Sequence, residues 1–565
     1  MGWHGRRVTD RRTEPSVTRQ RGSMRRFARS EDGSMVVFAL FILILMLGAG
    51  GLGIDFMRYE AQRTRLQATL DRAVLAAASL DQPLDPEAVV LDYFAKAGLS
   101  GYITADDIDV VDTLTSRRVT ATASMDINAT LLQFLGVKTL STPAGGAAEE
   151  SASQTEISLV LDVSGSMSWT SESGYSKIYE LRKAAKEFIN IVLCDPSDPQ
   201  KTTDCTVEPG KVSVNIIPYS EQVLVGESLL SLFNATSEHN FSSCVNFDAD
   251  DFDTTSITPL QELQRTGHFD PWSGRNGIGQ WTCATNSWRE LTVLGSNAAT
   301  LRSRINALGA SGNTSIDLGM KWGAAFLDPA TQPVITDLVT AGTVDAAYDG
   351  RPLDWTERGV EKVIVLMTDG INTDQHYLYD DHRVGPSPVW RTNDKVSGDY
   401  RYSIYRESNG QYYWPHSDSW DDHAFGTGSV DVCEQVWVST GWWWGYWDTQ
   451  CTQQPEPGGG AYQLDFTELW ATKSWAWYDN FWFLPSHGSE FGNSTKNARL
   501  DDICTAAKDQ DITIFSVGFE VTSASATVMR NCANSPAHYF DVDGLDLSDA
   551  FAAIAREISK LRLVN

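Results

Sequence analysis

Several signatures of catalysis and metal chemistry are missing from this sequence. It has no Gly-x-x-x-x-Gly-Lys-[Ser/Thr] loop, which argues against an ATPase, and no His-Glu-x-x-His motif of the zinc peptidases. None of the eight cysteines forms a Cys-x-x-Cys pair, so neither a zinc ribbon nor a dithiol redox site is expected. We therefore expect a binding protein rather than an enzyme, and assign no catalytic residue.

Positive charge is also scarce. Lysine and arginine number 45 against 73 aspartates and glutamates, which gives a formal net charge of -28. A body this anionic repels phosphate backbones, so nucleic acid is not an expected partner. The exception is the N-terminus, where residues 1–30 hold nine arginines against Asp10 and Glu14.

Residues 33–54 contain no charged residue. As a helix these 22 residues span about 33 Å, enough for a hydrocarbon core of about 30 Å. The Arg-rich tail, residues 1–32, is expected to stay in the cytoplasm and the rest of the chain to lie outside. A cleaved signal peptide is the alternative, but the leader and the apolar segment are both longer than such peptides have. No second segment of this kind follows, so a single transmembrane span is predicted.

The segments after the span divide into three parts. Residues 55–80 are predicted to form a helical stalk, because Leu66, Leu70, Val74 and Ala77 share one face at helical spacing. Residues 81–150 indicate a small α+β module that ends in a linker over residues 142–150. Residues 151–565 form the main domain.

The main domain alternates strand and helix patterns, which predicts an α/β fold: a doubly wound, mainly parallel sheet flanked by helices. The expected strands are 157–161, 212–217, 363–367, 512–517 and 539–542, and the expected helices are 178–192, 298–308, 316–326, 497–509 and 548–561. Long insertions at about 220–289 and 371–494 interrupt this alternation.

The second insertion holds twelve of the nineteen tryptophans, including Trp442, Trp443 and Trp444. Aromatic area of this size is rarely left in water, so we expect a packed subdomain stapled by Cys433 and Cys451. The alternative is an aromatic platform for a glycan or protein partner.

All eight cysteines follow the predicted span, on the side where disulfides form. They allow 105 pairings. Pairing between nearest neighbours is favoured because each bridge then closes a local loop: Cys194–Cys205, Cys244–Cys283, Cys433–Cys451 and Cys504–Cys532.

Two predicted strands end in aspartate. Asp162 ends the first and is followed by Ser164 and Ser166, while Asp369 follows the strand at 363–367. Carboxyl ends of parallel strands form the ligand crevice of a doubly wound sheet. Thr314 lies in a loop before a helix and can add a third hydroxyl.

These five oxygen donors suit a hard divalent cation such as Mg²⁺. Two carboxylates neutralise the ion, hydroxyls and water fill other positions, and one position remains for an Asp or Glu of a protein partner. The alternative is that Ser164 and Ser166 only cap the following helix.

The Asp-x-Ser-x-Ser motif, the separate threonine loop and the later Thr-Asp-Gly resemble the metal-ion-dependent adhesion site of von Willebrand factor A (vWA) domains. The resemblance implies that Asp162, Ser164, Ser166, Thr314 and Asp369 surround Mg²⁺ or Mn²⁺. It also implies that a partner's carboxylate completes the coordination.

A second resemblance is to TadG-type Flp/Tad pilus-assembly proteins. It rests on the Arg-rich tail and single span, on the segments 53–60, 66–78, 216–220, 313–323 and 558–563, and on Cys504 with Cys532. It implies a bacterial inner-membrane protein with a periplasmic vWA domain, whose partners are pilus machinery or pilin in pilus assembly or tight adherence. The competing hypotheses are a surface adhesin that binds host protein or glycan through the Trp-rich insertion, and a metal-dependent hydrolase.

Overall fold

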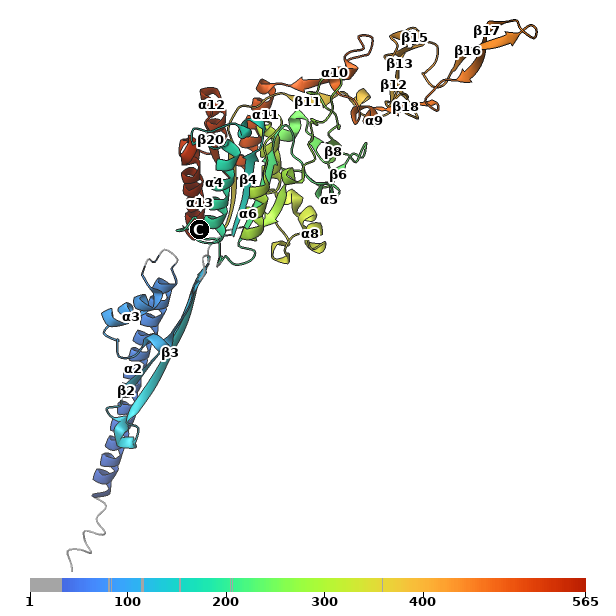
Figure 1. Cartoon of the computed structure of the whole chain (residues 1–565). Helices are drawn as coiled ribbons and strands as arrows, with labels where there is room; N and C mark the ends of the chain where they lie inside the picture. The colour runs from blue at the N-terminus through green and yellow to red at the C-terminus, as the bar shows by residue number, and fades with distance from the viewer. Residues whose placement is uncertain are drawn as a thin grey trace, which may run out of the picture. The chain divides into compact units, whose positions relative to one another are not determined.

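Two compact units divide the chain, one formed mainly by residues before Ser151 and one by the residues that follow (Figure 1). The computed structural model describes residues 33–79, 82, 84–112, 116–151, 154–203, 205, 207–357 and 359–564. The Arg-rich tail predicted to be cytoplasmic lies outside these described residues.

The first unit is built on one long helix, α2 (Ser34–Ala78), which runs without a break through the predicted span and stalk. Its N-terminal part is long and apolar enough to cross a membrane, consistent with a membrane anchor. Its C-terminal part buries Leu66, Leu70, Val74 and Ala77, the face that the helical spacing predicts.

A second helix and a three-stranded sheet complete this unit. Helix α3 (Pro86–Lys96) packs on α2. The sheet has the order β1-β2-β3, with β1 (Ile108–Asp112), β2 (Ser116–Asn128) and β3 (Thr139–Ser151).

The linker predicted over residues 142–150 is wrong, because these residues form most of β3. Thr142 and Ala144 are buried, and a Cβ atom at Gly146 would lie 3.7 Å from both Leu70 and Val74 of α2. Gly146 thus faces α2, whereas the position of Gly145 is open, and the segment that indicated a linker is a strand beside the helix.

The second unit contains a six-stranded sheet in the order β21-β20-β10-β4-β5-β9. Its strands are β4 (Gln154–Asp162), β5 (Val212–Tyr219), β9 (Thr292–Gly295), β10 (Val360–Thr368), β20 (Thr513–Phe519) and β21 (Tyr539–Val542). Neighbours pair in parallel except β9, which pairs antiparallel to β5 at the edge. Numbered along the chain, the order is 3-2-1-4-5-6, so it reverses between β4 and β10.

Helices cover both faces of this sheet. Ile157, Leu159 and Leu161 of β4 pack with α4 (Lys177–Leu193), α6 (Ala298–Ala307) and α13 (Leu547–Val564). Val160 and the strands beside it pack on the opposite face with α7 (Ile316–Ala325), α8 (Gln332–Thr340), α11 (Asn493–Asp509) and α12 (Ser523–Cys532). The four central strands β4, β5, β10 and β20 are buried almost throughout, as expected for parallel strands under two helical layers.

The first insertion is more structured than its polar sequence suggests. It contains α5 (Glu227–Leu230) and three short strands, β6 (Asn234–Ala235), β7 (Val245–Asn246) and β8 (Glu262–Arg265), in the order β6-β8-β7. Phe233 and Phe247 pack edge-on against Trp322 of α7, which anchors the insertion to the sheet domain.

The second insertion forms a five-stranded antiparallel sheet and two accessory ribbons (Figure 1). The sheet has the order β15-β14-β13-β12-β18, from β12 (Pro386–Thr392), β13 (Tyr402–Arg406), β14 (Gln411–Trp414), β15 (Ser419–Asp421) and β18 (Ala461–Asp465). Helices α9 (Phe466–Trp470) and α10 (Trp475–Tyr478) add to its aromatic core. One ribbon pairs β11 (Gln375–Leu378) with β19 (Gly488–Phe491), and the other pairs β16 (Ser429–Ser439) with β17 (Gly445–Pro455).

The prediction that this insertion buries its tryptophans is only partly right. Trp470 is buried in the aromatic core, but Trp442, Trp443 and Trp444 are almost fully exposed at the end of the β16–β17 hairpin. The Cys433–Cys451 bridge staples that hairpin and not the packed core.

The four disulfides join nearest neighbours in sequence, which confirms the favoured pairing. They are Cys194–Cys205, Cys244–Cys283, Cys433–Cys451 and Cys504–Cys532. The last of these links α11 to α12 on one face of the central sheet.

Candidate metal centre

Asp162 ends β4 at the edge where the strand order reverses. Its side chain is fully buried. Oδ1 accepts a hydrogen bond from the backbone N–H of Ser164 at 2.8 Å, and Oδ2 accepts one from the Thr368 hydroxyl at 2.7 Å. Because β4 and β10 run in parallel with Leu161 opposite Met367, both strands deliver their last residues to the same edge.

A chain of side-chain hydrogen bonds joins three more of the predicted residues. The hydroxyls of Ser164 and Ser166 lie 3.1 Å apart, and the Ser166 hydroxyl donates to Asp369 Oδ1 at 2.6 Å. Ser164 stands at the N-terminus of a short 3₁₀ turn (Gly165–Ser168), but its side chain does not cap that turn. Both hydroxyls therefore belong to the polar cluster, and the capping alternative does not describe Ser164.

Thr314 lies in a loop whose residues Ser311 and Gly312 are bonded to the Asp162 loop. The loop before α7 is bonded to the Asp162 loop, since Ser311 N–H donates to Val163 O at 3.0 Å and Gly165 N–H donates to Gly312 O at 2.8 Å. The buried Lys496 of α11 donates to Thr314 O at 2.7 Å. The structure thus brings four predicted residues into one hydrogen-bonded chain and places the fifth in the adjoining loop.

Asp162 and Asp369 are neighbouring carboxylates at this edge. Burial, and next to it the charge of Asp369, raises the pKa of the Asp162 carboxyl to about 7. The cation nearest to Asp369 is Lys177 at the start of α4, whose Nζ lies 3.2 Å from Asp369 Oδ2 and 3.6 Å from Glu520 Oε2. One ammonium is therefore shared between two carboxylates.

The donor set fits a hard divalent cation. Asp369 Oδ2 is buried and accepts no hydrogen bond from the described residues, although Lys177 lies within ion-pair distance. This carboxylate oxygen, the two serine hydroxyls and the second carboxylate are oxygen donors of the type that Mg²⁺ and Mn²⁺ prefer. Asp162, Ser164, Ser166, Thr314 and Asp369 would hold such an ion.

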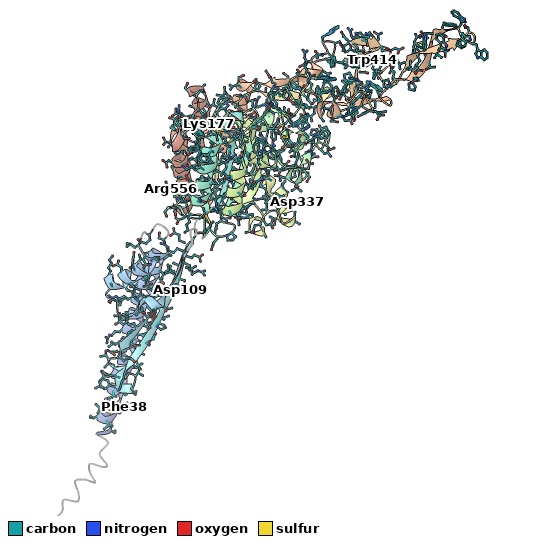
Figure 2. All side chains as sticks on the ribbon, viewed as in Figure 1. Phe38, Asp109, Lys177, Asp337, Trp414 and Arg556 are labelled. Atoms are coloured by element: carbon teal, nitrogen blue, oxygen red, sulfur yellow. A yellow bond between two sulfur atoms is a disulfide. The ribbon has the colours of Figure 1, made fainter. Side chains whose placement is uncertain are left out.

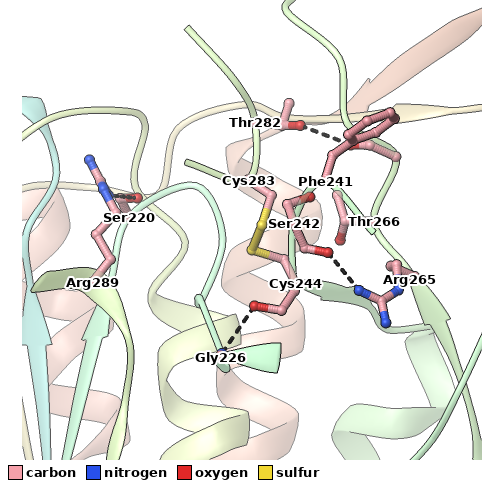
Figure 3. The surroundings of a disulfide bond; sticks show 12 residues. Ser220, Gly226, Phe241, Ser242, Cys244, Arg265, Thr266, Thr282, Cys283 and Arg289 are labelled. Atoms are coloured by element: carbon pink, nitrogen blue, oxygen red, sulfur yellow. Dashed lines mark hydrogen bonds between the residues drawn. A yellow bond between two sulfur atoms is a disulfide. The ribbon is translucent and has the colours of Figure 1, made fainter. Parts of the chain in front are cut away.

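A polar cavity of about 680 Å³ borders the Thr314 loop. Ser220, Arg289 and Ser311 lie in its wall. The Arg289 guanidinium donates to Ser220 Oγ at 2.6 Å (Figure 3). It also donates to Ser311 O at 2.9 Å, and burial lowers its pKa to about 10. This arginine ties the loop after β5 to the loop that carries Thr314, while the Cys244–Cys283 bridge holds the neighbouring wall (Figure 3).

Sequence reasoning missed Thr368, Lys177, Arg289 and Lys496. Thr368 directly precedes Asp369 at the strand end, so the Thr-Asp-Gly segment was a local signal for it. The other three come from distant parts of the chain and carry no motif, and their roles depend on the tertiary fold.

The comparisons with known proteins agree with the N-terminal resemblance. Residues 33–80 match the family described as "Putative Flp pilus-assembly TadE/G-like". The match covers the apolar segment and the part of α2 that follows it, and it confirms the TadG-type resemblance for that part of the chain. No curated protein matches the chain.

Among solved structures, the pilus adhesin SpaC from Lactobacillus rhamnosus GG is 12% identical, with a TM-score of 0.29 over 80% of this chain and 34% of SpaC. The chain thus spans about a third of SpaC. The vWF domain of the type V pili tip protein Mfa5 from Porphyromonas gingivalis is also 12% identical, with a TM-score of 0.29 over 72% of this chain and 96% of that domain. Superpositions this loose carry no argument about the site.

Proposed function

We propose that this chain is a membrane-anchored vWA-type protein that binds a protein partner through a divalent metal ion, in Flp/Tad pilus assembly or tight adherence. The pilus-related role is supported by the family match of residues 33–80. The vWA-type, doubly wound arrangement is supported by the sheet order, the antiparallel edge strand β9 and the helices on both faces.

The observation that carries the metal site is the bonded chain from Ser164 through Ser166 to Asp369, next to the buried Asp162. Two carboxylates come from two neighbouring strand ends, and the hydroxyls are neutral. A divalent ion held this way has a coordination position left open for one further anionic ligand. An Asp or Glu of a pilus component is the ligand that this chemistry fits best, and Mg²⁺ or Mn²⁺ is the ion.

The anchor sets where the site works. With the arginines of residues 1–32 on the cytoplasmic side, α2 crosses the inner membrane once and the sheet domain lies in the periplasm. The four disulfides suit that oxidising compartment.

Titration calorimetry on the full-length protein in detergent tests the metal site. We expect saturable binding of Mg²⁺ and Mn²⁺ to the wild type, and a loss of at least about 100-fold in affinity for Asp162→Ala. Asp337→Ala is the matched control, since Asp337 is exposed on α8 and Figure 2 shows it at the opposite end of the sheet unit from Lys177. Equal affinities for the wild type and Asp162→Ala would disprove the assignment.

The partner is tested separately, by crosslinking and pull-down from cells with and without chelator. A pilus component that is captured only when the metal is present, and by Asp337→Ala but not by Asp162→Ala, is the expected result. If the component is captured equally well with and without chelator, the metal site itself is not disproved, but its role in partner binding is.

A further inference from the structure

The far end of the β16–β17 hairpin carries an unusual concentration of exposed aromatic side chains. The last strand pair is Ser439 with Gly445, and the loop between them closes with a hydrogen bond from Thr440 N–H to Trp444 O at 2.9 Å. Trp442, Trp443 and Trp444 fill this loop and are 99%, 90% and 80% exposed. Figure 1 shows the hairpin extending beyond the five-stranded sheet of the same insertion.

This exposure is not general in the insertion. Trp470 is buried, and Trp475 stacks on Phe269 with ring centroids 5.0 Å apart. Trp482 is exposed outside the hairpin, but the Arg406 guanidinium lies over its ring at 4.9 Å. These other tryptophans of the insertion are thus buried or covered by a neighbouring side chain, whereas the three at the tip are exposed to solvent.

Apolar side chains occupy both faces of the ribbon near the tip. Trp437 and Trp447 form a cross-strand pair on one face, edge to face, with centroids 5.4 Å apart. Val436 and Tyr446 are exposed on the other face, because neighbouring residues of a strand point to opposite sides. A protein or glycan docked on one face would leave the other in water, and rings inclined at 68° offer no flat platform for a sugar. A medium that surrounds the tip, such as lipid, would cover both faces of the ribbon.

The charge of the hairpin indicates which kind of medium fits the tip. Residues 429–455 contain Asp431, Glu434 and Asp448 and no lysine, arginine or histidine. All three acids lie in the strands, behind the tryptophan loop. Tryptophan and tyrosine favour the interface of a bilayer, while negative charge is repelled by anionic lipid headgroups. The pattern fits a zwitterionic membrane surface.

The hairpin is stabilised by a disulfide between its two strands and not by a packed core. Two-stranded ribbons are marginally stable alone, and the Cys433–Cys451 bridge joins directly paired residues in the middle of this one. At the tip, a Cβ atom on Gly445 would lie 2.5 Å from the Trp437 ring, so glycine there lets the ring fold over the turn.

From these observations we propose that the β16–β17 tip, residues 436–447, inserts into the interface of a zwitterionic phospholipid bilayer. It gives the protein a membrane contact in addition to α2. The contact needs neither the metal site nor its partner, so the two proposals stand or fall separately.

Vesicle capture tests this proposal while α2 is kept out of the measurement. Full-length protein is reconstituted in nanodiscs, immobilised, and exposed to phosphatidylcholine vesicles. We expect capture by the wild type and a decrease of at least about tenfold for the triple variant Trp442→Ser, Trp443→Ser, Trp444→Ser. Trp482→Ser is the control, an exposed tryptophan outside the hairpin, and should capture like the wild type.

Vesicles with equal phosphatidylglycerol and phosphatidylcholine should be captured several-fold less, because the hairpin is acidic. Equal capture by the wild type and the triple variant would overturn the proposal. So would the absence of capture by the wild type above empty nanodiscs, or capture of a soluble glycan or protein by the tip without capture of phosphatidylcholine. Near-wild-type circular dichroism of the triple variant shows that a loss of capture is not a loss of folding.

Discussion

The two ends of β4 carry buried carboxylates in opposite electrostatic settings. Glu156, near the start of the strand, accepts hydrogen bonds from Arg351 at 2.9 Å and Lys362 at 2.6 Å. Asp162, at its end, accepts from a hydroxyl and a backbone N–H, and its neighbour Asp369 is another carboxylate. Both side chains are fully buried, so burial does not distinguish them.

The difference lies in charge balance. Two cations pair with Glu156, whereas Lys177 is the one cation among the described residues within ion-pair distance of Asp369 and Glu520. A buried carboxylate with cationic partners fixes the fold, because removing it leaves those cations unpaired. A buried carboxylate beside a like charge is destabilised by it, and sites that bind cations keep such a pair. The same strand thus serves structure at one end and, as we propose, binding at the other.

Glu156→Ala should give the largest effect on stability. It leaves Arg351 and Lys362 buried without their carboxylate, for which the expected loss is about 3–5 kcal/mol in the free energy of unfolding. Metal affinity should not change, because six residues of strand, about 20 Å, separate Glu156 from Asp162. Urea denaturation and calorimetry measure the two quantities. A variant as stable as the wild type would show that the balanced cluster does not hold the fold.

Asp162→Asn should act in the opposite direction when chelator is present. An amide keeps the bond from Ser164 N–H and can donate to Thr368, but it removes the like charge. The folded-state pKa of Asp162, about 7, lies above its ordinary value of 3.8, so the wild type loses stability as pH rises between these values. Each unit of pKa is worth about 1.4 kcal/mol, and we expect the variant to be more stable by about 2 kcal/mol at pH 8.

The check is urea denaturation at pH 4.5 and pH 8, in chelator and in Mg²⁺. The gain should be small at the lower pH, and Mg²⁺ should stabilise the wild type but not the variant. A variant less stable than the wild type in chelator at pH 8 would mean that the charge of Asp162 is already compensated by the fold.

The residues at the carboxyl edge of the sheet were largely predictable from the sequence, whereas the cluster around Glu156 was not. Asp162, Ser164, Ser166 and Asp369 sit at strand ends, where a local motif fixes their position once the sheet is parallel. The balanced cluster at Glu156 was not predicted, since Arg351 and Lys362 lie about 200 positions later and no short motif links them to Glu156.

The errors have a shared physical cause. Residues 142–150 were predicted to be a linker because glycines such as Gly145 and Gly146 are frequent in loops, but Gly146 lies against α2 within a strand. Trp442, Trp443 and Trp444 were expected in a packed subdomain because aromatic area of this size is rarely left in water. In both cases the residue type was interpreted without its packing partner, which composition does not give.

The smallest expected effects are changes in metal affinity on substitution at or beside Lys177. They test whether its ammonium competes with the metal ion for Asp369. Lys177→Met removes a cation 3.2 Å from Asp369 Oδ2, so Mn²⁺ should bind about tenfold more tightly. Glu520→Gln removes the second partner of Lys177 and leaves its ammonium to Asp369 alone, so Mn²⁺ should bind about threefold more weakly. Calorimetry on the two variants, with Asp337→Ala as control, measures both shifts. If both variants changed the affinity in the same direction, Lys177 would not be a counter-ion that competes with the metal. The difference in charge balance between the two ends of β4 would then not depend on Lys177.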